Sequence, residues 1–133
     1  LCSRSGLMAD IGCACVPYAH AEAGAVAAPV AVVAFVNRWF GPSQMAVRQL
    51  QATAPSLGVE VFFVDADQEA HRAHQLGIWA APALLFFARG SQLTVQRPEA
   101  DDANKYVGSI SMDELDSLLR QARESLTSGN AVL

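Results

Sequence analysis

The most constraining feature of this chain is an uninterrupted apolar run at residues 30–36, which is followed closely by a proline-containing turn. The run reads Val-Ala-Val-Val-Ala-Phe-Val, the pattern of a strand that is covered on both faces, as in a parallel sheet. The turn contains Trp39, Gly41 and Pro42 and opens a helical pattern. Proline suits the first turn of a helix, because the N–H group that it lacks would have no partner there. The segment therefore predicts a buried strand, a turn and a helix, in that order.

The pattern continues with a second strand and a short helix. The first helix has an apolar face made of Ala46, Val47, Leu50 and Ala54. Pro55 and Gly58 are expected to end it, and residues 59–65 are again strand-like. Asp67 is the expected cap of a short helix that runs through Leu76 and closes at Gly77. Strand, helix, strand and helix in this order predict a right-handed β-α-β unit.

The second half of the chain has a hairpin pattern followed by one long helix. Residues 83–88 and 92–96 are two extended runs joined by a glycine-containing turn, and residues 98–104 are polar and irregular, as in a loop. Residues 105–110 are expected to add a short strand. Ser111 and Glu114 have the spacing of a capping box before an amphipathic helix that reaches Leu126. The whole pattern predicts an α/β fold in which helices flank a central mixed β-sheet.

Composition narrows the class of protein. The 133 residues suffice for one domain, and 52% of them are hydrophobic. The net charge of −4 and the scattered positions of the nine basic residues argue against a nucleic-acid groove. The apolar runs at 30–36 and 83–88 are far shorter than the roughly 20 residues that cross a bilayer, so membrane insertion is not expected.

Four short motifs together resemble the thioredoxin family. Residues 39–45 read W-F-G-P-S-Q-M, which is similar to the thioredoxin active-site segment W-C-G-P-C-K-M. In family order there follow Leu76-Gly77-Ile78, Ala81-Pro82 before a strand and Val107-Gly108 before the last helix. The resemblance covers residues 29–126 and implies a thioredoxin-like domain at 29–128, with an N-terminal extension at 1–28, partly ordered, and a tail at 129–133. It also implies a cis peptide bond before Pro82.

The chain departs from the family at the positions that perform its chemistry. Phe40 and Ser43 stand where the family has its two cysteines, and Ala34 stands where it has a buried aspartate. Thiol–disulfide exchange needs an attacking thiolate and a second thiol that resolves the mixed disulfide. Phe40 cannot ionise and Ser43 cannot form a sulfur bond. We therefore expect no enzyme activity, no catalytic residue and no cofactor.

Other reactive residues have simpler interpretations. Cys2, Cys13, Cys15 and His20 could together bind a soft metal, and Cys13 and Cys15 could form a strained disulfide, but idle thiols are the simpler reading. His71 and His74 share a helix face without a third ligand nearby. Asp65, Asp67 and Glu69 fit helix capping, and Ser43 has no general base beside it. No metal site is predicted.

The resemblance leads to the hypothesis of a non-catalytic domain that acts by protein–protein binding, as an adaptor, a structural subunit or a chaperone-like module, and this hypothesis has two rivals. A protein partner or an extended peptide would bind a groove lined by Trp39, Phe40, Gly41, Pro42, Trp79, Ala80, Ala81, Pro82 and Gly108. In the family, the residue before the cis-proline pairs its backbone with an extended client segment, which is Ala81 here. One rival is an oxidoreductase that uses Cys13 and Cys15, and the other is an inert scaffold within a larger assembly. Cytoplasm and an organellar lumen are both compatible with the sequence, the latter after removal of a targeting segment.

Overall fold

The computed structural model describes residues 15–95, 105–108, 110–129 and 131–133. Its elements, in chain order, are α2 (Tyr18–Ala27), β1 (Val30–Val36), α3 (Gly41–Thr53), the 3-10 turn η1 (Pro55–Leu57), β2 (Glu60–Asp65), α4 (Ala70–Gln75), β3 (Ala83–Ala88), β4 (Ser91–Gln92), β5 (Tyr106–Val107) and α5 (Met112–Ser128). The strands and helices predicted from residue 30 to residue 88 are confirmed, with boundaries that differ by a few residues at most.

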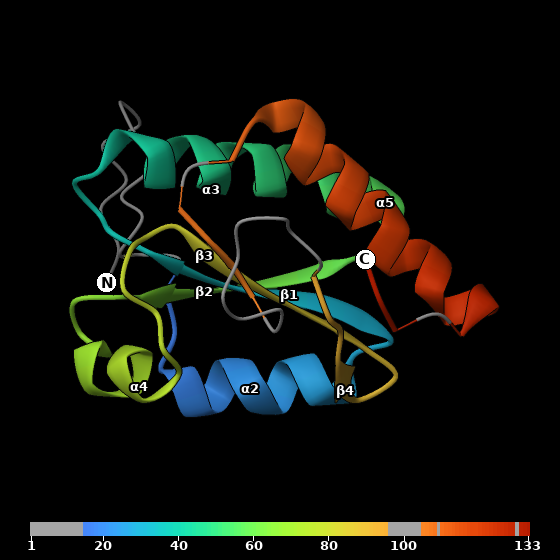
Figure 1. Ribbon diagram of the computed structural model, residues 1–133, viewed down its shortest axis with the longest axis horizontal. Coiled ribbons are helices and arrows are strands. Elements are labelled where there is room, and N and C mark those ends of the chain that lie inside the picture. Colours follow the sequence, from blue (N-terminus) through green and yellow to red (C-terminus); the bar gives the residue numbers. More distant parts are fainter. Residues whose placement is uncertain (1–14, 96–104, 109, 130) are drawn as a thin grey trace.

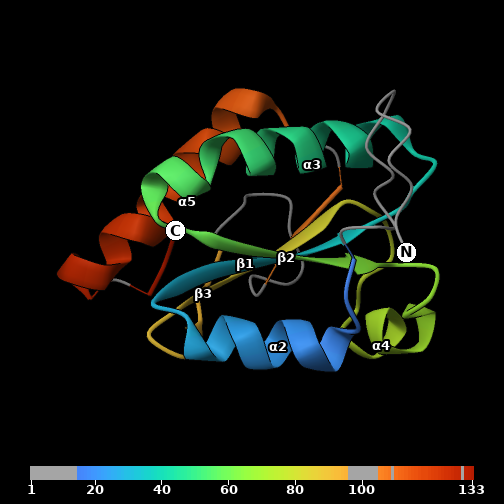
Figure 2. The same ribbon diagram turned by 180° about the vertical axis from the view of Figure 1, so that it is seen from behind.

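The strands form one mixed sheet between two layers of helices. The strand order is β2-β1-β3-β4, and β5 pairs with the start of β3. β1 is parallel to β2 and antiparallel to β3, so the β1-α3-β2 unit is the predicted crossover. α3 and α5 cover one face of the sheet and α2 and α4 cover the other (Figures 1 and 2). The predicted α/β arrangement, a mixed sheet flanked by helices, is confirmed.

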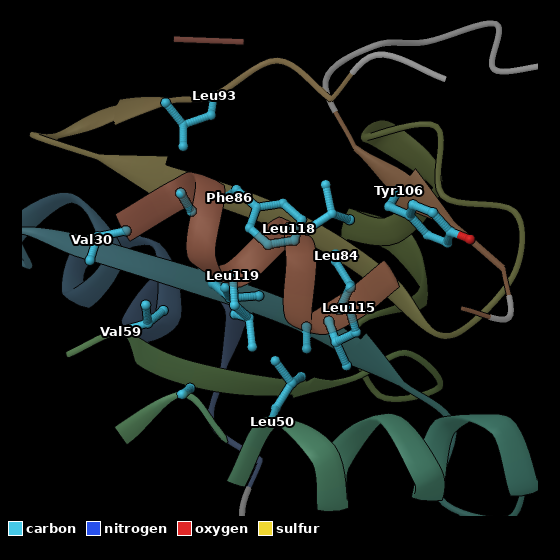
Figure 3. Close-up of a cluster of buried hydrophobic side chains, with 14 of the residues drawn as sticks. Val30, Leu50, Val59, Leu84, Phe86, Leu93, Tyr106, Leu115, Leu118 and Leu119 are labelled. Carbon is cyan, nitrogen blue, oxygen red and sulfur yellow. The ribbon is translucent and has the colours of Figure 1, made fainter. Parts of the chain in front are cut away.

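β1 is apolar throughout because both of its faces are buried. Alternate side chains point to the α3/α5 face, namely Val30, Val32, Ala34 and Val36. The others, Ala31, Val33 and Phe35, point to the α2/α4 face. On the first face, leucines of α3 and α5 gather against Leu84 and Phe86 of β3 (Figure 3). The central strand thus contributes to two separate cores.

The segment predicted as a partly ordered N-terminal extension contains a helix that packs on the sheet. The expected extension at 1–28 includes α2, yet Tyr18, Ala21 and Ala25 are buried in the core between α2 and the sheet. The chain before α2 also joins the sheet, since Cys15 pairs in parallel with Phe63 and the Val16 amide donates to the Phe63 carbonyl oxygen at 2.8 Å. Residues 1–14 lie outside the described part. The described part of this segment, from Cys15 onward, therefore packs against the sheet.

α2 packs closely on the sheet because its buried face is made of small residues. A Cβ atom placed on Gly24 would lie 2.5 Å from the ring of Phe62, so glycine lets this ring rest against the helix. The first turn of α2 is held by the residue that precedes α4, since the Tyr18 amide donates to the Glu69 carboxylate at 2.8 Å. The Tyr18 ring also lies 5.6 Å from the ring of Phe35 and 5.3 Å from the Arg72 guanidinium. These contacts fix α2 to the domain.

The attachment of α2 predicts a dependence of stability on alkaline pH. The pKa of the Tyr18 phenol is raised from 10.0 to about 12. Burial is the largest cause, and the negative charge of Glu22 and the hydrogen bond to its carboxylate add to it. The folded protein therefore holds this proton more tightly than the unfolded chain does. Its contribution to the free energy of unfolding is fully present below pH 10 and is lost as the pH rises through 12.

When the pH is raised from about 9 to about 11, we expect the free energy of unfolding to fall less in the Tyr18→Phe variant than in the wild type. Denaturant unfolding at about pH 9 and about pH 11 measures the difference, since all other titrating groups are common to both proteins. Phenylalanine keeps the ring that contacts Phe35 and Arg72. An equal loss of unfolding free energy in both proteins would contradict the assignment.

The hairpin and the C-terminal residues differ in part from the prediction. Arg89 and Gly90 join β3 to β4 with φ values of 53° and 81°, and positive φ at both central residues is the pattern of a type I′ turn. Of the second extended run, predicted at 92–96, Gln92 belongs to β4 and residues 93–95 lie outside the named strands, while residue 96 lies outside the described part of the chain. Thr94 pairs with Val132, so residues 131–133 of the predicted tail are hydrogen-bonded to the chain that follows β4.

Two predicted helix caps have different outcomes. The Ser111 hydroxyl accepts the Glu114 amide at 3.1 Å, which confirms the cap of α5. Asp67 does not cap α4, because that helix begins later, at Ala70, after Glu69. Asp65 takes the capping role in the preceding turn, where its carboxylate accepts the amides of Asp67 and Gln68. The predicted loop at 98–104 lies outside the described residues.

Candidate functional site

The predicted site residues lie at one end of the sheet. β1 ends before the turn at residues 37–40, and β3 begins after Pro82; because the two strands are antiparallel, these segments meet at the same end. Phe35 pairs with Ala83 there, and the Gly108 amide donates to the Pro82 carbonyl oxygen at 2.8 Å. The Ala81–Pro82 peptide bond is cis. Figure 1 shows the β1–α3 turn and the connection from α4 to β3 at the left end of the molecule.

Side-chain hydrogen bonds hold the turn between β1 and α3. The Asn37 amide donates to the Ser43 hydroxyl at 3.1 Å, and the Asn37 side-chain oxygen accepts the Trp39 amide at 3.1 Å. The Gln44 side-chain amide donates to the Arg38 carbonyl oxygen at 3.1 Å. The Phe40 amide donates to the Asn37 carbonyl oxygen. Polar groups from both sides of the turn are therefore paired, and the backbone that carries Trp39 and Phe40 is part of this hydrogen-bonded arrangement.

Large apolar side chains project into solvent at this end. Trp39 and Trp79 are each 80% exposed, Met45 is 52% exposed and Phe40 is 45% exposed. We call these four residues the aromatic patch. Among the described residues, only Val26 and Val132 are comparably exposed large apolar side chains, and they lie in α2 and at the chain end. Exposed apolar surface is therefore concentrated at the predicted site.

The positions that correspond to the thioredoxin thiols have different environments. Phe40 is exposed just before α3, whereas Ser43 is fully buried in the first turn of α3 with its hydroxyl engaged by Asn37. Ala34 is fully buried between Phe63 of β2 and Leu84 of β3. The three positions thus present an exposed ring, a structural hydroxyl and a core methyl group.

Most of the remaining predicted residues are less exposed than the aromatic patch. Gly41 is exposed, while Pro42, Ala80, Ala81 and Gly108 are half-buried and Pro82 is buried. A hollow of about 490 Å³ lies elsewhere, between the end of α3 and the start of β2, and is lined by Leu50, Pro55, Val59 and Val61 among others. None of the predicted site residues lines this hollow. The candidate site is therefore a surface around the turn.

Sequence reasoning missed two residues of this site. Met45 belongs to the aromatic patch; its position opposite the apolar face of α3, four residues after Gly41, was the available signal. Asn37 organises the turn through its backbone and its side chain. Nothing in the spacing of the motif indicates that role, because it depends on the conformation of the folded turn.

The other candidate ligands do not form a metal site in the described residues. His71 and His74 are exposed on α4, and no group of three or more His, Cys, Asp or Glu side chains gathers within the described ranges. Cys15 is half-buried beside Phe63, and Cys2 and Cys13 lie outside the described residues. No helix in the described part of the chain is long and apolar enough to cross a membrane.

Comparison with solved structures identifies the fold. A mutant thioredoxin from Halobacterium salinarum is 24% identical, with a TM-score of 0.63 over 77% of this chain and 82% of that chain. Mitochondrial thioredoxin 3 from Saccharomyces cerevisiae, in its oxidised form, is 15% identical, with a TM-score of 0.65 over 85% of this chain and 99% of that chain. Thioredoxin from Malassezia sympodialis is 22% identical with a TM-score of 0.61, over 80% and 88% of the two chains. No protein-family model and no curated protein matches the sequence. The chain has a thioredoxin-like fold.

Proposed function

We propose that this chain is a non-catalytic thioredoxin-like domain that acts by binding a protein partner through the aromatic patch and the adjoining Ala81–Pro82 loop. The observation that supports this most directly is the exposure of Trp39, Phe40, Met45 and Trp79 together at one end of the sheet. Large apolar side chains that are exposed in one region of a protein surface are typical of an interaction site. Tryptophan and other aromatic residues are also enriched among the residues that dominate binding energy at interfaces.

The hydrogen bonds of the turn support the same function. The hydrogen bonds of Asn37 and Gln44 fix the backbone that presents Trp39 and Phe40. A surface that is ordered before binding loses less conformational entropy when the partner arrives. The polar side chains of Asn37 and Gln44 therefore hold the backbone from which Trp39 and Phe40 project into solvent.

The residues at the thiol positions argue against exchange chemistry. A phenyl ring at position 40 offers no nucleophile, and the Ser43 hydroxyl is buried and bonded to the Asn37 amide. Ala34 cannot transfer a proton, which is the role of the aspartate in the family. In this proposal the partner would contact Phe40 directly and would pair an extended segment with the Ala81 backbone, which requires no sulfur.

We expect the purified protein to reduce a protein disulfide no faster than background. Insulin reduction in the presence of dithiothreitol is a suitable assay, with a dithiol thioredoxin as the positive control. The Phe40→Cys, Ser43→Cys double variant is expected to gain weak exchange only, since Ala34 remains and the Ser43 hydrogen bond is lost. Thioredoxin-like turnover that disappears in Cys13→Ser or Cys15→Ser would favour the oxidoreductase alternative.

Binding is tested by co-purification from the native source, in which the wild type is compared with Phe40→Ala and Trp79→Ala. Both side chains are exposed, so the variants are expected to fold normally. Loss of a specific, reproducible partner in both variants supports the proposal. Retention of every partner would favour the inert scaffold, with contacts on other surfaces.

A further inference from the structure

β2 lies at one edge of the sheet, and the described chain covers only part of its outer side. The strand order is β2-β1-β3-β4, so β1 occupies the inner side of β2. On the outer side, Cys15 pairs in parallel with Phe63, and the Val16 amide donates to the Phe63 carbonyl oxygen at 2.8 Å. In a parallel ladder the backbone groups of alternate residues point to the same neighbour, so Val61 also faces outward. Within the described ranges, no residue pairs with Val61 on that side.

The hollow of about 490 Å³ lies beside this uncovered part of β2. Leu50 and Pro55 line it from the side of α3, and Val59, Val61 and Phe63 line it from β2 and the residue before that strand. These last three side chains belong to the core cluster on the α3/α5 face, so the hollow opens onto that core. An apolar side chain placed in the hollow would be removed from water, which stabilises the folded state.

The pairing of Cys15 with Phe63 sets a register for the residues that precede Cys15, which themselves lie outside the described part of the chain. The two paired segments run in the same direction, and both advance by about 3.3 Å per residue when extended. Each step back from Cys15 therefore matches one step back from Phe63. In this register Cys13 lies opposite Val61, the residue whose outer side is uncovered.

The same register brings Ile11 to the hollow. Two residues before Cys13, Ile11 lies opposite Val59, which lines the hollow. Every second side chain of a strand points to the same face, and the Cys15 side chain packs against the α3/α5-face cluster, so Ile11 and Cys13 face that cluster too. Ile11 is the one large apolar residue in the segment 10–14, and its β-branched side chain suits a strand.

We propose that residues 11–14 of this chain bind along the outer edge of β2, with the Ile11 side chain in the hollow. Continuity with the pairing at Cys15 selects this occupant, because a strand from another molecule would have to displace the residues that lead directly into that pairing. The backbone of the segment would pair with Val61, and Ile11 would fix its register. The inference does not depend on the proposed function, since no residue of the aromatic patch lines the hollow.

This arrangement determines what the thiols of Cys13 and Cys15 can do. Side chains two residues apart on one strand face are about 7 Å apart, whereas the two Cβ atoms of a disulfide are about 3.5 to 4.5 Å apart. The two cysteines therefore cannot form a disulfide with each other while the segment is bound. Facing the core, both thiols are also sheltered from reagents in solvent. The oxidoreductase alternative would require the segment to leave the edge of β2.

The register is tested by disulfide cross-linking in the full chain. The substitutions Cys2→Ser and Cys15→Ser leave Cys13 as the only native thiol. Val61→Cys then adds a thiol opposite Cys13, whereas the matched control Glu60→Cys adds one at the preceding residue, where a strand side chain points to the other face. After oxidation with diamide, peptide mapping by mass spectrometry is expected to find more than about half of the Val61→Cys protein cross-linked to Cys13, and less than about a tenth of the control.

The role of Ile11 is tested by thiol labelling, which leaves β2 unchanged. In the Cys2→Ser protein, Cys13 is expected to react with dithionitrobenzoate about a hundredfold more slowly under native conditions than in denaturant. Ile11→Ser removes the apolar side chain from the hollow and should speed the native reaction about tenfold. Ile11→Val is the conservative control and should leave the reaction rate near that of the parent protein.

Each other outcome would overturn the inference. Native labelling of Cys13 as fast as in denaturant would mean that the hollow is open, and slow labelling without the Val61 cross-link would mean that Cys13 is buried elsewhere. Equal cross-linking of the Val61→Cys and Glu60→Cys proteins would exclude a fixed register. A cross-link between two copies of the chain would make a second copy the occupant. The proposed function is unaffected by these results, because it is tested by the native partners of Phe40→Ala and Trp79→Ala.

Discussion

Phe40→Ala is expected to weaken binding of the native partner about thirtyfold, which corresponds to about 2 kcal/mol. The ring is 45% exposed at the start of α3, and the polar groups of the turn hold its backbone in place. Truncation removes apolar contact area from the interface but leaves those hydrogen bonds intact. Trp79→Ala should have an effect of similar size, since this side chain is 80% exposed in the free protein.

The measurement is the dissociation constant of the co-purified partner, determined together with the denaturation midpoint of each variant. Val26→Ala is the matched control, because Val26 is a comparably exposed apolar residue, at 48%, in α2. It should change neither quantity. An unchanged dissociation constant in both patch variants would mean that the partner contacts another surface, as the inert-scaffold alternative requires.

The parts of the fold that were predictable are those in which the local pattern matches the tertiary environment. Residues 30–36 are apolar throughout because both sheet faces are covered, and the structure buries every residue of β1. Helix boundaries were also predictable. Pro42 lies in the first turn of α3, and Gly58 and Gly77 have the positive φ that follows a helix end. At these positions the local sequence strongly favours one conformation, and the folded protein has that conformation.

The parts that were not predictable depend on contacts between distant segments. α2 is rich in alanine and glycine and has no strong apolar stripe, so its buried face becomes evident only when Phe62 and Phe35 are in place. The pairing of Thr94 with Val132 joins residues that are far apart in the sequence. Neither feature has a local signal in the sequence.

The candidate site was predicted in outline and not in detail. The order of the motifs placed Trp39, Phe40 and Trp79 at one end of the sheet, where the structure has them. The bond between Asn37 and Ser43 could not be predicted, because a buried serine hydroxyl has several possible partners until the backbone is known. The sequence therefore indicates which residues form the surface but not what holds them there.

Phe35→Ala is expected to have the largest effect on stability, a loss of about 4 to 5 kcal/mol in the free energy of unfolding. Phe35 is fully buried on the α2/α4 face of the sheet and lies 5.6 Å from the Tyr18 ring. Six of the thirteen residues that form this core cluster are alanines, Ala21, Ala25, Ala28, Ala31, Ala73 and Ala83. Alanine side chains cannot rotate into a cavity, so most of the space left by the ring should stay empty.

The same truncation on the opposite face provides the comparison. Phe86 is also fully buried, but its cluster contains leucines of α3, β3 and α5, including Leu50, Leu84 and Leu119 (Figure 3). Leucine side chains can change rotamer and fill part of the cavity, so Phe86→Ala should cost about 3 to 4 kcal/mol, less than Phe35→Ala. Denaturant unfolding of both variants measures the two losses under one condition. The reverse order would mean that α2 moves inward to close the space, so that the N-terminal helix is less firmly attached than its contacts with Glu69 and Arg72 imply.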